Sequence, residues 1–142
     1  CGIVLMHMQR DPLTMQFNPD YHNVVAEVIE FLKDRSDLLI ARGISKDRIA
    51  IDPGFGFGKR TEHNLTLLNQ LSSLQSLGLP LLIGLSRKSV LGQVVGSEVD
   101  ERIHGSIAAS VVSAMKGANI VRVHDVKPTV DALKIVSAVM KN

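Results

Sequence analysis

The sequence has few of the residues that disulfide-bonded, metal-cluster and membrane proteins rely on. It contains one cysteine, Cys1, no tryptophan, and only 4% aromatic residues. A single cysteine can form neither an internal disulfide nor a cysteine metal cluster, which fits a reducing compartment. No stretch approaches the roughly 20 uninterrupted apolar residues that span a bilayer. We therefore expect a cytoplasmic location and no membrane partner.

The charge of the chain has no strong bias in either direction. The formal net charge is +2 at pH 7, and the basic residues are scattered along the sequence. Nucleic-acid binding depends on clustered lysine and arginine residues, often with interleaved aromatic residues, so we expect no nucleic-acid partner. Small anionic ligands remain compatible with this charge. With 142 residues, 45% of them hydrophobic, the chain is long enough for one domain with its own core.

Four short apolar runs alternate with four segments of helical periodicity. The runs predict buried strands at residues 2–7, 48–52, 80–84 and 119–123. The periodic segments predict helices at residues 21–42, 63–77, 100–116 and 128–140. Continuously apolar strands that alternate with helices indicate parallel βαβ units, so the predicted fold class is α/β. Periodicity alone fits both a (β/α) barrel and a doubly wound sheet.

Polar or glycine-rich residues follow each expected strand, at the end where either architecture places its ligand site. Asp52 comes directly after an apolar run, so its carboxylate would lie at the mouth of the core. There it could accept two hydrogen bonds from a flat, amidine-like edge, such as that of a pterin or a guanine. The alternative interpretation is an aspartate that caps a turn.

The segment DPGFGFGK, residues 52–59, resembles a phosphate-binding loop only superficially. Its glycine spacing fits neither the Walker loop nor the dinucleotide-binding fingerprint. The glycines instead permit sharp turns that would leave Phe55 or Phe57 available to cover an aromatic ligand. A turn whose phenylalanines pack on their own core is the competing interpretation.

Cationic residues follow the third and fourth expected strands. In the segment SRKS, residues 86–89, Lys88 could donate to a ring carbonyl or nitrogen and a serine could bind a carboxylate, although solvated loop charges are the alternative. Arg122 and His124 are two residues apart, so on a strand they would point to the same side. Such a pair suits a phosphate group. The remaining histidines, which form no zinc-binding pattern, are His7, His22, His63 and His104.

The four strand ends together resemble one family. The segments LMHMQ, DPGFGFGK, GLSRKS and IVRVHDV occur in this order over essentially the whole chain. In this combination they are similar to bacterial dihydropteroate synthases, transferases of folate biosynthesis. These enzymes condense 6-hydroxymethyl-7,8-dihydropterin pyrophosphate with p-aminobenzoate to give 7,8-dihydropteroate and pyrophosphate. The resemblance implies an eight-stranded (β/α) barrel of about 250 residues. Residues 1–142 would be its C-terminal half, a partial pterin-binding domain with about four βα units.

The resemblance also implies roles for individual residues. Asp52 would hold the amino-pyrimidine edge of the pterin, and Lys88 would contact the same ring. Arg122 and His124 would bind the pyrophosphate. The implied catalytic residues are Lys88, Arg122 and His124. The other implied substrate-binding residues are Met6 and Phe57 at the pterin pocket, Gly84 beside it, and Ser86 near the p-aminobenzoate carboxylate.

Partners and a cofactor are implied as well. Magnesium would stabilise the charge on the departing pyrophosphate, with protein ligands from the first half of the barrel and none from this chain. A half barrel would leave strand edges and an apolar inner face uncovered. We therefore expect the chain alone to be inactive and to associate with itself or with the N-terminal half of the barrel. The resemblance further implies a homodimer formed through the last helices, and a target of sulfonamides.

Two alternative functions fit the same motifs. The pterin-binding domain of a methyltetrahydrofolate-dependent methyltransferase shares the barrel and the pterin aspartate. The pair Arg122 and His124, together with SRKS, argues against it, because methyl transfer has no pyrophosphate to bind. A non-catalytic, self-associating half barrel would keep the motifs without the activity, and activity after mixing with an N-terminal half would distinguish it.

Overall fold

The computed structural model describes residues 1–15 and 17–141, and within them four β-strands run parallel to one another. The strands are β1 (Ile3–Met6), β2 (Ile49–Asp52), β3 (Leu82–Ile83) and β4 (Ile120–Val121). β1 pairs with β2 and β3 pairs with β4. A parallel bridge between Ile51 and Leu81 joins the two pairs, and the Ile51 N–H donates to the Pro80 carbonyl at 2.8 Å. The strands therefore lie side by side in their order along the chain.

Helices separate the strands in sequence. The α-helices of the described residues are α1 (Val24–Ala41), α2 (Thr61–Asn69), α3 (Ser89–Val95), α4 (Ile103–Met115) and α5 (Val126–Met140), and the short 3-10 helices are η1 (Lys46–Arg48), η2 (Leu71–Leu77) and η3 (Val99–Glu101). α1 begins where the Asn23 side chain accepts a hydrogen bond from the Ala26 N–H at 3.1 Å. It ends before Gly43, whose φ of 88° favours glycine. No helix in the described part of the chain is long and apolar enough to cross a membrane.

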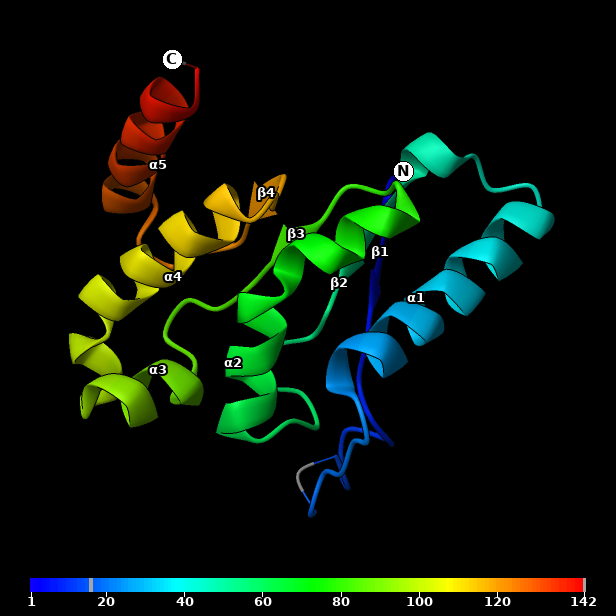
Figure 1. Ribbon diagram of the computed structural model, residues 1–142, viewed down its shortest axis with the longest axis horizontal. Coiled ribbons are helices and arrows are strands. Elements are labelled where there is room, and N and C mark those ends of the chain that lie inside the picture. Colours follow the sequence, from blue (N-terminus) through cyan, green and yellow to red (C-terminus); the bar gives the residue numbers. More distant parts are fainter. Residues whose placement is uncertain (16, 142) are drawn as a thin grey trace.

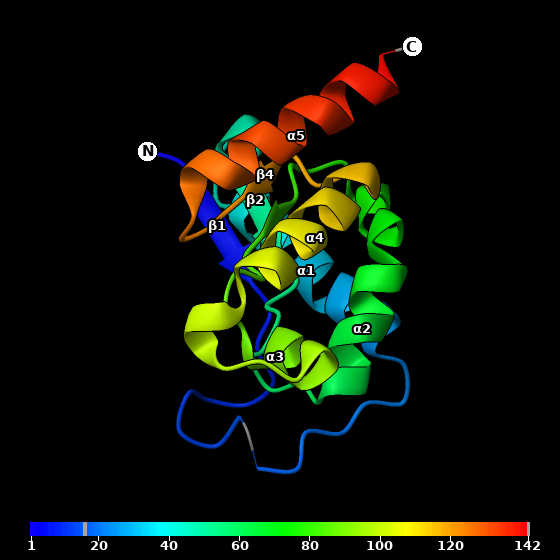
Figure 2. The same ribbon diagram turned by 90° about the vertical axis from the view of Figure 1, so that its left-hand side faces the viewer.

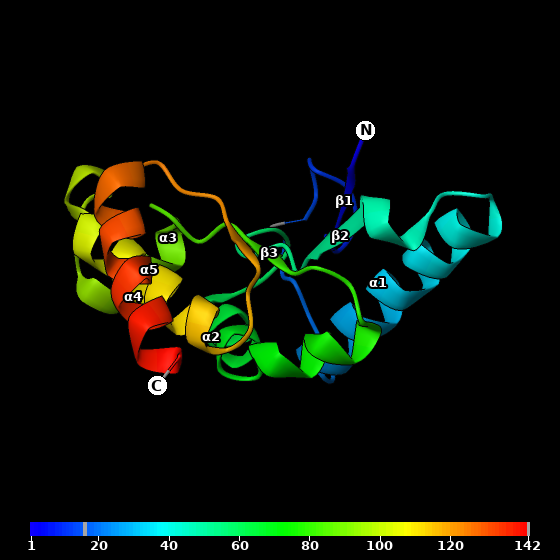
Figure 3. The same ribbon diagram turned by 90° about the horizontal axis from the view of Figure 1, so that it is seen from above.

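The helices are not distributed evenly around the strands. Figure 3 shows α1 and α2 on one side of β1, β2 and β3, and no α-helix of the described residues on the opposite side. α5 packs against α4, away from β1 (Figure 1). In Figure 2 the arrow of β1 points toward the end of the molecule that carries α3 and the segment between β1 and α1. This end holds the carboxyl termini of the strands.

The hydrophobic core fills the space between the strands and the helices α1, α2 and η2. Alternation along β2 turns Ile49 and Ile51 toward these helices, where both are buried. On β1, by contrast, Val4 is 51% exposed. The helical residues that are fully buried against the strands are Val28, Leu32, Leu67, Leu71 and Leu74.

The α/β class and the four strands and four helices expected from the sequence are confirmed, with bounds that differ by a few residues. The helix expected at residues 63–77 is divided, because α2 ends at Asn69 and η2 follows as a 3-10 helix. α2 begins at Thr61, and Arg60 occupies the N-cap. α3 was not expected, because its seven residues are too few to show a clear helical period and include a glycine.

We expect Leu71→Ala to destabilise the fold, because Leu71 is 0% exposed and its truncation leaves a cavity in the core. The free energy of unfolding should fall by about 2–5 kcal/mol in urea denaturation. Leu65→Ala is the matched control, because Leu65 lies nearby on α2 and is 43% exposed. Leu65→Ala should lose less than half as much free energy of unfolding as Leu71→Ala. Equal losses in the two variants would contradict the placement of the core.

Candidate functional site

The residues that follow the strands come together around Asp52, the last residue of β2. Met6 pairs with Asp52 in the parallel register of β1 and β2, and the His7 N–H donates to the Asp52 carbonyl at 3.0 Å. Beyond β4, Arg122 reaches the same residue, with its Nη2 atom 3.8 Å from Asp52 Oδ2. Three separate parts of the chain therefore meet at one residue, two through its backbone and Arg122 at its carboxyl group.

The Asp52 side chain is buried, with the residue only 3% exposed. Burial raises the pKa of Asp52, because desolvation disfavours the charged form. The Gly54 N–H, which donates to Oδ1 at 2.8 Å, and the cations Arg122, Lys88 and Lys59 act in the opposite direction and favour the carboxylate. A carboxylate offers about four acceptor sites. Asp52 therefore retains capacity for a ligand that brings donors.

The loop after β2 is held from inside by Lys59. Its buried Nζ atom donates to the carbonyls of Gly54 and Phe57, each at 3.0 Å, and lies 2.9 Å from His7 Nδ1. Burial lowers the pKa of Lys59 to about 7. Burial and the nearby Lys59 lower the pKa of His7 to about 4, so His7 is neutral at pH 7 and its Nδ1 can accept from the Lys59 ammonium.

Gly54 and Asn64 complete the support of this loop. Gly54 has a φ of 69°, and a Cβ atom there would lie 1.9 Å from the His7 carbonyl oxygen. Only glycine therefore fits where the loop crosses the end of β1. On α2, buried Asn64 accepts from the Gly56 N–H and donates to the Arg60 carbonyl, both at 2.8 Å.

The two phenylalanines of the loop have different surroundings. Phe55 fits the interpretation of a turn that packs on its own core, whereas Phe57 is accessible enough to cover a ligand. Phe55 is buried in the core. Phe57 is half-buried, and its ring centre lies 4.1 Å from Lys88 Nζ in a cation–π contact. Burial, and secondly the charge of Arg122, lowers the pKa of Lys88. Phe57 and Lys88 together form a partly open, flat wall beside Asp52.

A small cavity of about 90 Å³ lies next to this wall. Arg122 and His124 both line it, although β4 ends at Val121 and neither belongs to the strand that was expected to carry them. The other lining residues are Gly84, Ser86, Lys88 and Val123.

Ser86 fixes the histidine of this cavity. The backbone N–H of His124 donates to Ser86 Oγ at 3.2 Å, and the same oxygen lies 3.0 Å from His124 Nδ1. Gly84 makes room for the arginine, because a Cβ atom there would lie 2.7 Å from Arg122 Nη2. Arg122 itself is accessible, with 63% of its side chain exposed.

The structure thus places all eight residues singled out as substrate-binding at the same end of the strands. Their individual roles stay predictions. The sequence indicates the residues that support the site less clearly than those that line it. Lys59 belongs to the motif DPGFGFGK, but nothing in the sequence indicates that it is buried. The other supporting residues, which the sequence reasoning gave no role in this site, are His7, Asn64, Arg87 and Asp125.

The site does not provide a set of metal ligands. Among residues 1–15 and 17–141, no group of three or more histidine, cysteine, aspartate or glutamate residues is placed to hold a metal ion. The neighbours of Asp52 are the cations Lys88 and Arg122, which disfavour a second positive ion there. These residues do not fit a magnesium site of their own, so a role for magnesium stays a prediction.

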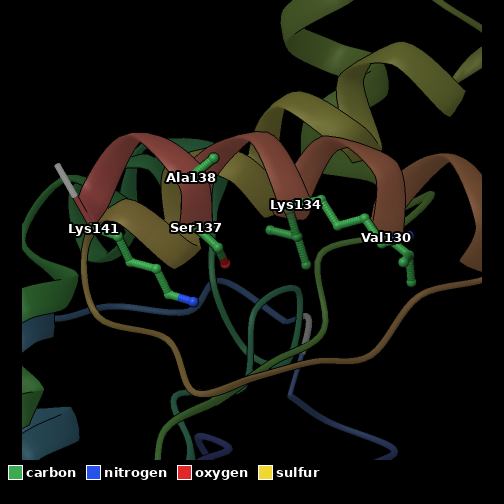
Figure 4. Close-up of a pocket in the computed structure, with 6 residues that line it drawn as sticks. Val130, Lys134, Ser137, Ala138 and Lys141 are labelled. Atoms are coloured by element: carbon green, nitrogen blue, oxygen red, sulfur yellow. The ribbon is translucent and has the colours of Figure 1, made fainter.

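A larger hollow of about 580 Å³ lies along α5 and is lined by residues of that helix and by Lys141, which follows it. Figure 4 shows its lining side chains. They include two lysines and a serine but no carboxylate, histidine or aromatic ring. This hollow lacks the groups that could bind and activate a heterocyclic substrate.

Residues 1–124 match the family model described as pterin binding enzyme. The chain belongs to the pterin-binding enzymes. Its relatives in this family include the dihydropteroate synthase of Neisseria meningitidis serogroup B, which is 55% identical over 138 residues. That match covers 94% of this chain and 48% of the relative.

Solved structures of pterin-binding enzymes have the same fold as this chain. The Yersinia pestis dihydropteroate synthase with a sulfonamide drug is 45% identical, with a TM-score of 0.96 over 99% of this chain and 51% of that one. The Xanthomonas albilineans dihydropteroate synthase in complex with 7,8-dihydropteroate is 47% identical, with a TM-score of 0.90 over 98% and 49%. The resemblance inferred from the motifs is confirmed, and the chain spans about half the length of these relatives.

We expect the stability of the chain to depend on pH through Lys59. Its pKa is about 7 in the folded chain and about 10.4 when unfolded. Between these values the unfolded state binds more protons, so stability should rise with pH, by at most about 1.4 kcal/mol per pH unit. Urea unfolding between pH 7 and 10 measures this slope.

Most of this slope should be lost in Lys59→Met, which cannot titrate, and the remainder comes from Lys88, whose pKa burial also lowers. Lys127→Met is the matched control, because the Lys127 side chain is 83% exposed, and it should keep the slope of the unmodified chain. If the free energy of unfolding rises equally with pH in Lys59→Met and in the unmodified chain, burial does not lower the pKa of Lys59.

Proposed function

We propose that this chain forms the C-terminal half of a dihydropteroate synthase barrel. The complete enzyme condenses 6-hydroxymethyl-7,8-dihydropterin pyrophosphate with p-aminobenzoate. The observation that supports this most strongly is the meeting of the buried Asp52 carboxylate with Lys88 and Arg122 at one end of parallel strands. The relatives that are named dihydropteroate synthase, one of them bound to 7,8-dihydropteroate, support the same reaction.

The distribution of exposed residues supports a half barrel that needs a second half. In the described residues β1 pairs only with β2, and β4 pairs only with β3, so two strand edges remain open. Val4, on the face of β1 away from α1, is 51% exposed although it is apolar. Four further strands would pair with both edges and cover this face. Residues 1–142 are accordingly one partial domain of the barrel.

The geometry around Asp52 suits the pterin. The amino-pyrimidine edge of a pterin presents two parallel N–H donors, which an ionised carboxylate can accept together. Burial makes this pairing stronger than it would be in water. Phe57 and Lys88 supply a flat wall for the ring, and Met6 lies one strand away in register. We assign Asp52 to hold the ring and Lys88 to donate to its acceptor atoms.

The cavity beside Arg122 suits the leaving group. The exposed arginine can bind two phosphate oxygens at once. Because the His124 N–H donates to Ser86 Oγ, the hydroxyl proton can point to Nδ1, which places the ring proton of His124 on Nε2 as a second donor. Both groups then stabilise the negative charge that develops on pyrophosphate.

The chemistry follows as a displacement at the pterin methylene carbon. The carbon–oxygen bond to pyrophosphate breaks, the amine nitrogen of p-aminobenzoate forms the new bond, and the amine loses a proton to solvent. Ser86 was expected near the p-aminobenzoate carboxylate. Its hydroxyl is buried and contacts His124, so it can also act by orienting that histidine.

Further partners remain part of the proposal. A homodimer through the last helices is supported by apolar side chains exposed on α4 and α5. The methyltransferase alternative is less well supported, because methyl transfer provides no anion for Arg122 and His124 to bind. We also infer a cytoplasmic enzyme that uses magnesium with ligands from outside this chain. The exposed apolar residues on these helices are Val112, Met115, Val126, Val130, Ile135, Val139 and Met140.

We expect activity to appear when the barrel is completed. Residues 1–142 produced together with the N-terminal half of the Neisseria meningitidis relative should convert both substrates to 7,8-dihydropteroate, and the chain alone should not. Product formation is measured by chromatography. A complex of the two halves that associates, as judged by light scattering, but forms no product would contradict the proposal.

We expect Arg122→Ala in the completed barrel to weaken the pyrophosphate ester selectively. Loss of a charged hydrogen bond should raise its Kd by about 10- to 100-fold, whereas the Kd of the bare hydroxymethyl pterin should change by less than about threefold. Calorimetric titration gives both constants, and Arg122→Lys, which keeps the charge, should fall between. Equal losses for the two ligands would contradict the role of Arg122.

A further inference from the structure

Arg87 lies between two residues of the proposed site, Ser86 and Lys88, and the proposed function gives it no role. Its φ of 58° lies in the left-handed region, which is unfavourable for a residue with a Cβ atom. Such a conformation persists only where the surroundings hold it. The contacts of Arg87 therefore indicate what keeps this part of the site in place.

The side chain of Arg87 forms a two-pronged ion pair with Asp125. Nη2 donates to Asp125 Oδ1 at 2.8 Å and Nε donates to Oδ2 at 3.2 Å. The side chains of Arg87 and Asp125 are 38% and 18% exposed. The hydrogen bonds from Arg87 lower the pKa of Asp125, so the pair stays charged at neutral pH.

The backbone of Arg87 is held from a second direction by Ser106 on α4 and by Arg102, the residue before α4. The Arg87 N–H donates to Ser106 Oγ at 3.0 Å, and the Arg87 carbonyl accepts from Arg102 Nη1 at 3.1 Å. Asp125 is fixed as well, because its carbonyl accepts from Oγ1 of the buried Thr129 at 2.7 Å. Both ends of the ion pair are thus anchored to the helices behind the site.

The Arg87–Asp125 pair connects the segment after β3 to the segment after β4. Ser86 and His124, one position earlier in each segment, form a second connection in parallel through their 3.0 Å contact. Two parallel connections prevent one segment from rotating or sliding against the other. The distance between Lys88, which follows Arg87, and His124, which precedes Asp125, is therefore set by this pair.

We propose that Arg87 and Asp125 are positioning residues for the reaction. They hold Lys88 at the pterin ring and His124 at the leaving group by fixing Arg87 in its left-handed conformation. This inference rests on the proposed function of the site. Without the pair, Arg87 relaxes toward a more favourable backbone conformation, and Lys88 moves from its place 4.1 Å from the Phe57 ring.

Steady-state kinetics of the completed barrel test this inference. The variants Arg87→Lys, which loses the fork but keeps the charge, and Asp125→Asn, which loses the charge but keeps the shape, should each lower kcat by about 10- to 100-fold. The KM for p-aminobenzoate should change far less. Because the two residues act as one unit, the double variant should lose no more than the worse single variant.

The controls separate positioning from folding and from the proposed function itself. Lys33→Ala breaks an exposed ion pair with Asp37 and should leave kcat unchanged. Thermal unfolding of each variant shows whether the folded fraction is retained, and Arg87→Gly, which adopts the same φ without strain, provides a second variant if Asp125→Asn does not fold. Arg87→Gly loses the ion pair but keeps the left-handed backbone without strain, so it should lower kcat less than Arg87→Lys does.

Either of two results would overturn the inference. One is a kcat within about twofold of the unmodified enzyme in Arg87→Lys or Asp125→Asn, which is smaller than the effect of a displaced catalytic group. The other is a double variant whose loss equals the product of the single losses. Absence of dihydropteroate formation by the unmodified completed barrel would instead count against the proposed function.

Discussion

A carboxylate that is buried at the end of a strand has to be compensated by the groups around it, because an isolated buried charge is very unfavourable. Asp52 is only 3% exposed, and its neighbours supply that compensation. The Gly54 N–H donates to it, Arg122 reaches it from beyond β4, and Lys59 holds the loop that carries the donor. The loop after β2 and the distant residue Arg122 are therefore both held in place around one side chain.

The same constraint explains why the site can bind a ligand. The contact from Arg122 is long, at 3.8 Å, and its guanidinium is largely exposed, so the compensation of Asp52 is only partial. A flat heterocycle that brings two N–H donors completes it in surroundings where water competes poorly. Free energy that the fold spends on desolvating the carboxylate is recovered when the ring binds, which favours ligands with that donor pattern over other flat rings.

The sequence predicted what depends on local patterns. Apolar strands, helix faces and the residues directly after each strand are visible in the residue order, so Asp52, Lys88, Arg122 and His124 could be found. The supporting contacts could not. Arg87 and Asp125 are 38 residues apart, and their pairing depends on two strands lying side by side. The short helix α3 could not be predicted either, because its seven residues are interrupted by Gly92 and are too few to show a clear helical period.

The most direct test of the central role of Asp52 is calorimetric titration of the completed barrel with 6-hydroxymethyl-7,8-dihydropterin, comparing Asp52 with Asp52→Asn. The amide has nearly the same shape but turns one acceptor into a donor that faces the N–H groups of the ring. Loss of a charge-assisted pair in a buried site predicts a Kd at least about 100-fold higher for Asp52→Asn. An unchanged Kd would contradict the account, because the pterin would then be recognised elsewhere.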